Sequence, residues 1–330
     1  MPRCALALKS LSLFPQLNLV VWGDLVADEF VDGEIARVSR EAPVLILKQR
    51  GRKLAAGGGA NAALNLAALG VHVRLVGAVG ADPPGRGLLQ LFRKAGVATS
   101  GIAVVRGRAT PTKTRILAHH AHTAPQQVVR LDQEPPPLSA GVQARLARSA
   151  RRALRGAQGL LVSDYGYASV SPALAAAARA PLSSVDARFQ IAAYHGMTAA
   201  TPNEPELESA LNCQISAHPD PPAALERAGR TLLRRLRCRH LLITRGRHGL
   251  ALFEPGRRTL HLPVFGSQQA LDVTGAGDTV IAVFTAALAA GADGPAAALL
   301  ANCAGGLVVM KPGTATVSAS ELRAALESLP

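Results

Sequence analysis

The residues best suited to chemistry lie in one octapeptide, Asp272–Thr279 (DVTGAGDT), which leads directly into an apolar stretch. Residues 275–277 are small, so their backbone N–H groups can converge on one point. A helix that begins here adds unpaired N–H donors and the positive end of its dipole. The segment therefore predicts an anion hole for a phosphoryl group in transfer.

Asp278 falls in the first turn of that helix, beside the expected anion. A carboxylate in this place can accept the proton of an attacking hydroxyl. GAGD alone would better fit an ordinary Gly-rich turn with an Asp cap, but the whole octapeptide is far more specific. The chain has no Gly-Lys dipeptide and no GxGxxG, which excludes a Walker A loop, a standard dinucleotide fingerprint and a protein-kinase Gly loop.

A second polar group follows an expected strand end in Thr201-Pro202-Asn203. If a helix opens there, Asn203 and Glu206 can reach the carboxyl edge of a parallel sheet, where ligands bind in such folds. The same spacing fits a capping box, in which Glu206 only stabilises the start of the helix. Spacing alone leaves the two interpretations equal.

The elements that must position these residues alternate along the chain. Strands are expected at 17–23, 73–79, 159–163, 183–186, 240–244 and 250–254, and helices at 60–69, 86–95, 141–156, 171–180, 222–237, 276–291 and 294–310. This alternation predicts an α/β fold with a mostly parallel sheet covered on both faces. Segments 25–56 and 106–132 instead alternate apolar and polar residues, which indicates strands with one wet face and a small β lid.

The 330 residues, 48% of them hydrophobic, suit a single domain over 1–330 with the lid as an appendage. No apolar run reaches the roughly 18 residues that span a bilayer, and residues 4–13 carry no clear cleavage signal, so no membrane partner is expected. The four cysteines are scattered without metal-ligand spacing, which favours a reducing cytoplasm.

The formal charge of +14 raises the alternative of a nucleic-acid binder. Only six of the 36 basic residues are lysines, and the densest run of arginines, within 145–155, alternates with apolar residues on an expected helix. A solvated helix face explains that run better, so no nucleic-acid partner is expected. His119, His120 and His122 lack a nearby Cys or carboxylate and are interpreted as loop or strand residues.

Two segments together resemble the ribokinase, or PfkB, family of carbohydrate kinases. Asp272–Thr279 is similar to its second signature, and residues 57–61 (GGGAN) are similar to its first. The resemblance extends from about residue 18 to 325, and within the family it points to the kinase domain that phosphorylates D-glycero-D-manno-heptose 7-phosphate at C1. Further segments carry that likeness: 23–24 with Asp28, 39–44, 112–113 with Arg115, 130–132, 163–165, 201–203 with Glu206, 272–281 and 313–318.

The resemblance implies a ribokinase-like three-layer α/β/α fold with a β lid, and the use of ATP and Mg²⁺. It makes Asp278 the catalytic base, with the anion hole at Gly275, Ala276 and Gly277. Asn203 and Glu206 would organise Mg²⁺ through water. The implied nucleotide contacts are Thr244, Gly246, Gly249, Thr274 and Asn302, although Asn302 fits a polar core residue equally well. The implied acceptor contacts are Asp28, Gly57, Gly58, Asn61, Lys113, Arg115, Asp132 and Arg188, and Asp272 and Thr274 could bind K⁺.

Two departures from the heptose kinases bear on the substrate. Residues 166–168 (GYA) lack the Lys that usually follows Ser-Asp-Tyr, and residues 186–188 read Asp-Ala-Arg in place of Asp-Pro-Lys. Arg188 keeps a cation that can hold a phosphate bidentately. The sequence ends at Pro330, so the C-terminal nucleotidyltransferase domain of bifunctional relatives is not expected.

Other functions stay open at this point. The chain could phosphorylate ribose, fructose or a related acceptor, as the change at Tyr167 would allow. It could also be a catalytically silent family member that binds nucleotide or sugar, although an intact Asp278 argues against this. The lid strands would present exposed edges, and pairing two lids would cover them. A homodimer through the lid is therefore expected.

Overall fold

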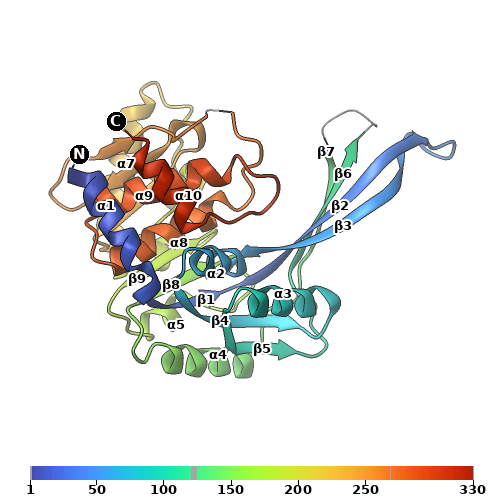
Figure 1. Ribbon diagram of the computed structural model, residues 1–330, viewed down its shortest axis with the longest axis horizontal. Coiled ribbons are helices and arrows are strands. Elements are labelled where there is room, and N and C mark those ends of the chain that lie inside the picture. Colours follow the sequence, from blue (N-terminus) through green and yellow to red (C-terminus); the bar gives the residue numbers. More distant parts are fainter. Residues whose placement is uncertain (1, 120–124, 268, 330) are drawn as a thin grey trace.

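The computed structural model describes residues 2–119, 125–267 and 269–329. Within them, nine strands form one sheet in the order β13-β12-β11-β10-β9-β8-β1-β4-β5 (Figure 1). Only the β11–β12 and β12–β13 pairs in this sheet are antiparallel, which confirms the expected mostly parallel sheet. The strands are β1 Asn18–Gly23, β4 His72–Gly80, β5 Ala98–Val105, β8 Gly159–Asp164, β9 Ser183–Ala187, β10 Ala199–Ala200, β11 His240–Thr244, β12 Leu250–Phe253 and β13 Leu260–Leu262.

Helices cover both faces of this sheet because its central strands are apolar on both sides. All six residues of β8 are buried. One core cluster joins the sheet to α1 Pro2–Leu13, α2 Gly59–Ala68, α3 Pro83–Lys94, α8 Ala276–Ala289, α9 Gly294–Val308 and α10 Ala319–Glu327. The other cluster joins it to α4 Ala140–Ala153, α5 Pro172–Ala176, α6 Glu204–Leu211 and α7 Pro221–Leu236. The expected three-layer arrangement is confirmed.

A second, four-stranded sheet projects from this body as the lid (Figure 1). Its order is β3-β2-β6-β7, with β2 Leu25–Val38, β3 Leu45–Gly58, β6 Thr112–His119 and β7 Gln126–Gln133. The first residues of β2 and the last of β3 are buried against the body, whereas all of β7 is exposed. The lid is thus anchored at one end, and its inner end lies beside the carboxyl edge of the main sheet.

Several boundaries differ from the sequence-based prediction. The helix expected at 171–180 is only α5, and α1, α10 and β5 were not predicted. The apolar residues of α1 are not confined to one face, so the sequence lacks the periodicity that marks a surface helix. Its Ala7 and Leu11 are nevertheless buried, where α1 packs against α9 and α10.

Three further expectations concern charge and partners. Across the described ranges, no helix is both long and apolar enough to cross a membrane. The five α4-region arginines (145, 148, 151, 152 and 155) are exposed, as a solvated helix face requires. His119 lies in β6, 3.3 Å from an Asp32 oxygen, whereas His120 and His122 fall outside the described residues. The part of the chain that is described holds no metal-binding cluster of three or more His, Cys, Asp or Glu side chains.

Candidate active site

The Gly-rich turn forms the N-terminus of α8. Gly275 is its N-cap, with a φ of 78° that favours glycine. A Cβ at this position would lie 2.4 Å from Nδ2 of Asn61, so the turn is also packed tightly. Helix geometry leaves the N–H groups of the first turn without partners inside the helix, although the Ala276 N–H donates to the Val273 carbonyl. The start of α8 therefore has the shape and polarity of an anion site.

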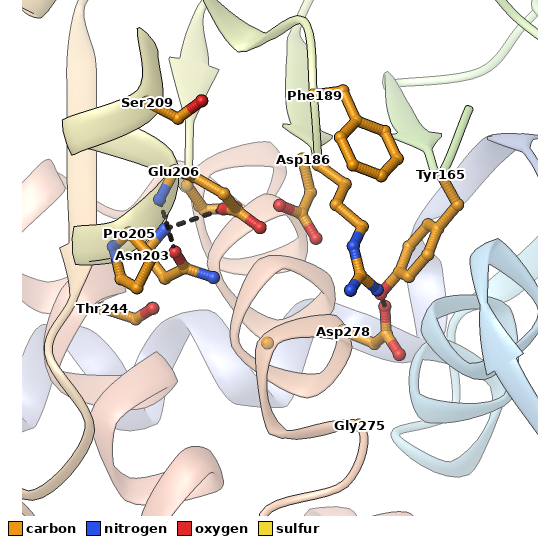
Figure 2. Close-up of a pocket in the computed structure, with 13 residues that line it drawn as sticks. Tyr165, Asp186, Phe189, Asn203, Pro205, Glu206, Ser209, Thr244, Gly275 and Asp278 are labelled. Atoms are coloured by element: carbon orange, nitrogen blue, oxygen red, sulfur yellow. Dashed lines mark hydrogen bonds between the residues drawn. The ribbon is translucent and has the colours of Figure 1, made fainter. Parts of the chain in front are cut away.

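Asp278 lies in that first turn and is only 3% exposed. One carboxylate oxygen accepts a hydrogen bond from Asn61 Nδ2 at 3.0 Å. The other accepts one from the Tyr165 hydroxyl at 2.8 Å (Figure 2). Burial raises the pKa of Asp278 to about 7, and the two hydrogen bonds oppose that rise. A carboxylate with this pKa is well matched to accept a proton near neutral pH.

Asn203 and Glu206 form the capping box of α6. Oδ1 of Asn203 accepts from the Glu206 N–H at 2.8 Å, and Oε2 of Glu206 accepts from the Asn203 N–H at 2.9 Å. Both residues also line the same cavity as Asp278 (Figure 2). The two interpretations left open by the spacing are therefore compatible, because one Glu206 oxygen caps the helix and the other remains for a ligand.

Two further residues, to which the sequence analysis gave no role, line the cavity beside Asn203 and Glu206. Asp186, at the end of β9, has a pKa well above its usual range because of burial and the charges of Glu206 and Asp278. The hydroxyl of Thr201 is buried and has no hydrogen-bond partner among the described residues. Carboxylate and hydroxyl oxygens are hard ligands that suit Mg²⁺ or its bound water. In the sequence, Asp186 was marked only by its place at the end of an expected strand, two residues before Arg188.

Three cavities meet at the start of α8, with volumes of about 480, 280 and 170 Å³. Gly277 and Thr244 border both the first and the second, while Gly275 and Asp278 border both the first and the third. Asp278 thus faces two of the three cavities, those of 480 and 170 Å³. A nucleotide, its phosphates and an acceptor can occupy the three in a row.

The 280 Å³ cavity is the most apolar and collects the predicted nucleotide residues. Thr244, Gly246, Gly249 and Asn302 line it together with Leu250, Val264, Val273, Val280 and others. Asn302 also donates from Nδ2 to the Pro263 carbonyl at 2.7 Å, so it fixes the wall of the cavity as well as lining it. Thr274, which was also predicted to touch nucleotide, lines the 170 Å³ cavity instead.

The 170 Å³ cavity collects most of the predicted acceptor residues. Its lining includes Asp28, Gly57, Gly58, Lys113, Arg115 and Arg188, and adds Arg130 and Tyr165, which the sequence did not assign. Asp28 pairs with Arg115 at 2.6 Å. Arg188 borders the 480 Å³ cavity as well, so it lies where an acceptor meets the transferring phosphate.

Two predicted acceptor residues do not line that cavity. Asp132 pairs with Lys113 at 3.0 Å and Arg130 at 2.9 Å, so it holds two cations at the rim. Asn61 lies behind the base, where its amide donates to Asp278 and to the Gly275 carbonyl. Both residues act on the groups that face the cavity.

Asp272 ties two loops together beside the site. One carboxylate oxygen accepts from the Thr274 N–H and the other from the Gly313 N–H, both at 2.9 Å. These contacts hold the approach to the Gly-rich turn against the segment that leads into α10. Whether Asp272 and Thr274 also bind K⁺ stays a prediction.

Comparison with known proteins agrees with this geometry. Residues 16–321 match the model of the pfkB family carbohydrate kinases. The chain belongs to the pfkB family of carbohydrate kinases. The predicted family is therefore confirmed, and the chain is a carbohydrate kinase by family.

Among the curated relatives of this pfkB chain are proteins named bifunctional protein HldE. The one from Desulfatibacillum aliphaticivorans is 37% identical over 97% of this chain, and the one from Nitrosococcus oceani is 39% identical over 95% of it. The chain spans 65% and 64% of the length of these two relatives. The likeness therefore concerns one portion of each bifunctional protein.

Solved structures of the same fold have much lower identity. Arabidopsis thaliana ribokinase, complexed with ribose and ATP, is 19% identical with a TM-score of 0.72, covering 94% of this chain and 98% of its own. Escherichia coli phosphofructokinase-2, in complex with potassium, is 17% identical with a TM-score of 0.76 and the same coverages. These likenesses establish the ribokinase-like fold.

Proposed function

We propose that this pfkB chain transfers the terminal phosphoryl group of ATP to the C1 hydroxyl of D-glycero-β-D-manno-heptose 7-phosphate. The product would be the 1,7-bisphosphate, a precursor for ADP-heptose and the lipopolysaccharide core. The segments similar to heptose 7-phosphate kinases support this substrate, and so does the likeness to the HldE proteins.

The charge of the acceptor cavity is the observation that carries the proposal. Four cations line it, Lys113, Arg115, Arg130 and Arg188, and apart from the base they are offset by Asp28, the neighbouring Asp132 and, beside Arg188, Glu206. Arginine binds phosphate oxygens through parallel hydrogen bonds, so this lining suits an acceptor that already carries a phosphate. A neutral sugar would leave the excess charge without a partner.

The proposed mechanism is in-line phosphoryl transfer across the three cavities. Asp278 accepts the proton of the acceptor hydroxyl as the new O–P bond forms and the bond to the ADP oxygen breaks. The N–H groups at the start of α8 stabilise the negative charge on the transferring group. Closure of the lid over the acceptor would exclude water, which would otherwise consume ATP.

Mg²⁺ fits the oxygen-rich wall opposite the base. Asp186, Glu206 and the unpartnered Thr201 hydroxyl would hold it or its waters, with Asn203 beside them. When bound, the ion neutralises negative charge on the phosphates of ATP. For K⁺, we propose that the loop around Asp272 and Thr274 provides carbonyl and hydroxyl oxygens, and replacing K⁺ by Na⁺ in the assay tests this.

The homodimer remains part of the proposal. Exposed apolar side chains gather on the lid, at Val38, Val44, Leu45, Val128, Val129 and Leu131. Its outer strands β3 and β7 each have an edge that pairs with no other strand of the described residues. A second lid would cover both features. A cytoplasmic location is likewise proposed, supported by four cysteines that are all unpaired.

The test is ADP release from Mg·ATP with a panel of acceptors, followed by ³¹P NMR of the product. The panel contains heptose 7-phosphate, the unphosphorylated heptose, ribose, fructose and fructose 6-phosphate. We expect turnover confined to heptose 7-phosphate with a new phosphate at C1. Turnover on ribose or fructose would keep the fold and mechanism but replace the substrate. Binding of ATP without turnover on any acceptor would favour a silent binding protein.

A further inference from the structure

The hydroxyl of Tyr165 contacts the base, and the mechanism above gives it no role. It lies 2.8 Å from Oδ1 of Asp278 (Figure 2), while Asn61 Nδ2 lies 3.0 Å from Oδ2. Each carboxylate oxygen thus accepts from one side chain, and the two side chains come from different elements, the loop after β8 and helix α2. Two donors on the two oxygens of one carboxylate fix its plane.

We propose that Tyr165 is a positioning residue for Asp278. With Asn61, its phenol holds the carboxylate in a single orientation, with the remaining lone pairs directed at the acceptor cavity, which Tyr165 and Asp278 both line. The inference rests on the proposed role of Asp278 as the base. It adds a residue that acts through the base, in the way that a third group orients the acid–base residue of other catalytic sites.

The backbone that carries Tyr165 is itself fixed by a buried carboxylate. Asp24 is fully buried and accepts hydrogen bonds from the N–H groups of Tyr165, Tyr167 and Ser169 at 2.8, 2.9 and 2.9 Å. Three donors from alternate residues bind the turn to the end of β1. The phenol is therefore presented by a rigid loop.

The ring of Tyr165 packs against a glycine of the first family signature. Gly58 has a φ of 57°, and a Cβ there would lie 3.2 Å from two ring carbons of Tyr165. Contacts of 3.2 Å are tighter than a carbon atom normally makes, so a side chain at this position would push the ring away from Asp278. Gly58 thus supports the base through Tyr165 as well as bordering the acceptor cavity.

The second donor is oriented in the same manner. Nδ2 of Asn65, one turn along α2, donates to Oδ1 of Asn61 at 3.0 Å. This contact directs the Nδ2 group of Asn61 toward Asp278, because its oxygen is already engaged. Asn65 is fully buried, so the arrangement is protected from water.

The proposal has a consequence for the pH dependence of the base. A donor to the charged form favours ionisation, so loss of the Tyr165 hydroxyl raises the pKa of Asp278 further above its usual value. The pKa of Tyr165 is itself raised, mainly by burial, so the phenol stays protonated and remains a donor. The other charged groups that line the two cavities beside Asp278 are unchanged by the substitution: Asp28, Lys113, Arg115, Arg130, Asp186, Arg188 and Glu206.

The test compares Tyr165→Phe with Tyr194→Phe. Both changes remove a phenol hydroxyl that donates to a carboxylate, since Tyr194 donates to Asp164 at 2.7 Å. Of these two tyrosines, only Tyr165 contacts Asp278. We expect Tyr165→Phe to move the acid limb of the kcat/KM profile upward by about one pH unit and to lower kcat about tenfold, with the KM for ATP unchanged. Tyr194→Phe should keep the wild-type acid limb.

The outcomes separate this inference from the proposed function. Circular dichroism and thermal unfolding establish that both variants fold. An acid limb of Tyr165→Phe within 0.2 units (about the error of such a fit) of wild type would overturn the positioning role, provided that wild type is active and Asp278→Asn is not. Wild type without kinase activity, or an active Asp278→Asn variant, would instead refute the proposed function. In that case ¹³C NMR titration of the Asp278 carboxyl still measures the contact, and an unchanged pKa in Tyr165→Phe would refute it.

Discussion

At the scale of residues, the site depends on a carboxylate that is kept away from water. Burial raises the pKa of Asp278 to about 7, and hydrogen bonds from Asn61 and Tyr165 keep it from rising further. The same burial that makes Asp278 a useful base also destabilises the folded chain when it is ionised. Its chemistry and its cost in stability are therefore two consequences of one environment.

The pH dependence of stability follows from that pKa. Since the folded-state pKa lies above the usual value of 3.8, the contribution of Asp278 to stability is fully present below about 3.8 and is lost as pH rises through 7. Asn cannot ionise, so the stability of Asp278→Asn relative to wild type should rise by about 2 kcal/mol as the pH is raised from 5 to 8. Urea unfolding at both pH values measures the difference. Equal pH dependence in the two proteins would contradict a raised pKa.

Glu206→Gln tests the proposed magnesium wall. Gln keeps an acceptor for the Asn203 N–H, so the capping box survives while one negative charge is lost. We expect the Mg²⁺ concentration for half-maximal activity to rise about tenfold. Glu321→Gln is the matched control, because it makes the same change in the capping box of α10. If the activity of wild type and of Glu206→Gln depended on Mg²⁺ concentration in the same way, Glu206 would not be part of the metal site.

The site was predictable only in part, and the reason differs between residues. Asp278 and the 275–277 turn were evident because a Gly-rich turn before an apolar helix has a local pattern. Tyr165 and Asp186 were missed because their meaning depends on the side-by-side placement of β8, β9 and α8, which no local pattern encodes. Asp132 and Asn61 were expected to contact the acceptor, whereas in the structure each contacts a residue that lines the acceptor cavity.

At the scale of elements, the start of α8 carries the site because its backbone is constrained from two sides. Gly275 has a positive φ, and its carbonyl accepts a hydrogen bond from Asn61 on α2 at 3.2 Å. The alternation of apolar strands and helices predicted this βα architecture well, since buried parallel strands are continuous apolar runs. It failed for β5, whose Thr-Ser-Gly segment interrupts the apolar pattern, and for α1, which lacks a polar face.

Gly275→Ala tests the constraint on this turn, with Gly291→Ala as its control. Both glycines have a positive φ, 78° and 86°, so each substitution should cost about 1 kcal/mol in stability from backbone strain. A Cβ at 291 meets nothing within 4 Å, whereas a Cβ at 275 meets Asn61. We expect kcat to fall about 100-fold only in Gly275→Ala, because displacing Asn61 moves the base. Equal activity in the two variants would show that the turn tolerates displacement.

At the scale of the whole molecule, the lid joins the acceptor site to the proposed dimer. Its inner end supplies Asp28, Lys113 and Arg115 to the acceptor cavity, while its outer part carries exposed apolar residues. Because β2 and β3 run continuously between these ends, burial of the outer part would stiffen the inner one. Dimerisation would then support the binding of the acceptor.

A charge on the exposed lid strand tests the dimer. The double change Val129→Glu with Leu131→Glu places two carboxylates on β7, where the side chains are 46% and 57% exposed. We expect a dimer for wild type and a monomer for this variant by size-exclusion chromatography with light scattering. Val104→Glu, equally exposed at 48% but on β5 outside the lid, should remain a dimer. A monomeric wild type at micromolar concentration would refute the proposal.

The most direct test of the central claim is kcat/KM for heptose 7-phosphate and for the unphosphorylated heptose, measured by ADP release with wild type and Asp278→Asn. The proposed account predicts a preference for the phosphorylated sugar of about 100-fold or more, from the cations around the acceptor cavity. It also predicts a loss of about 1000-fold in kcat on removal of the base. Equal use of both sugars, or an Asp278→Asn variant that keeps wild-type turnover, would contradict it.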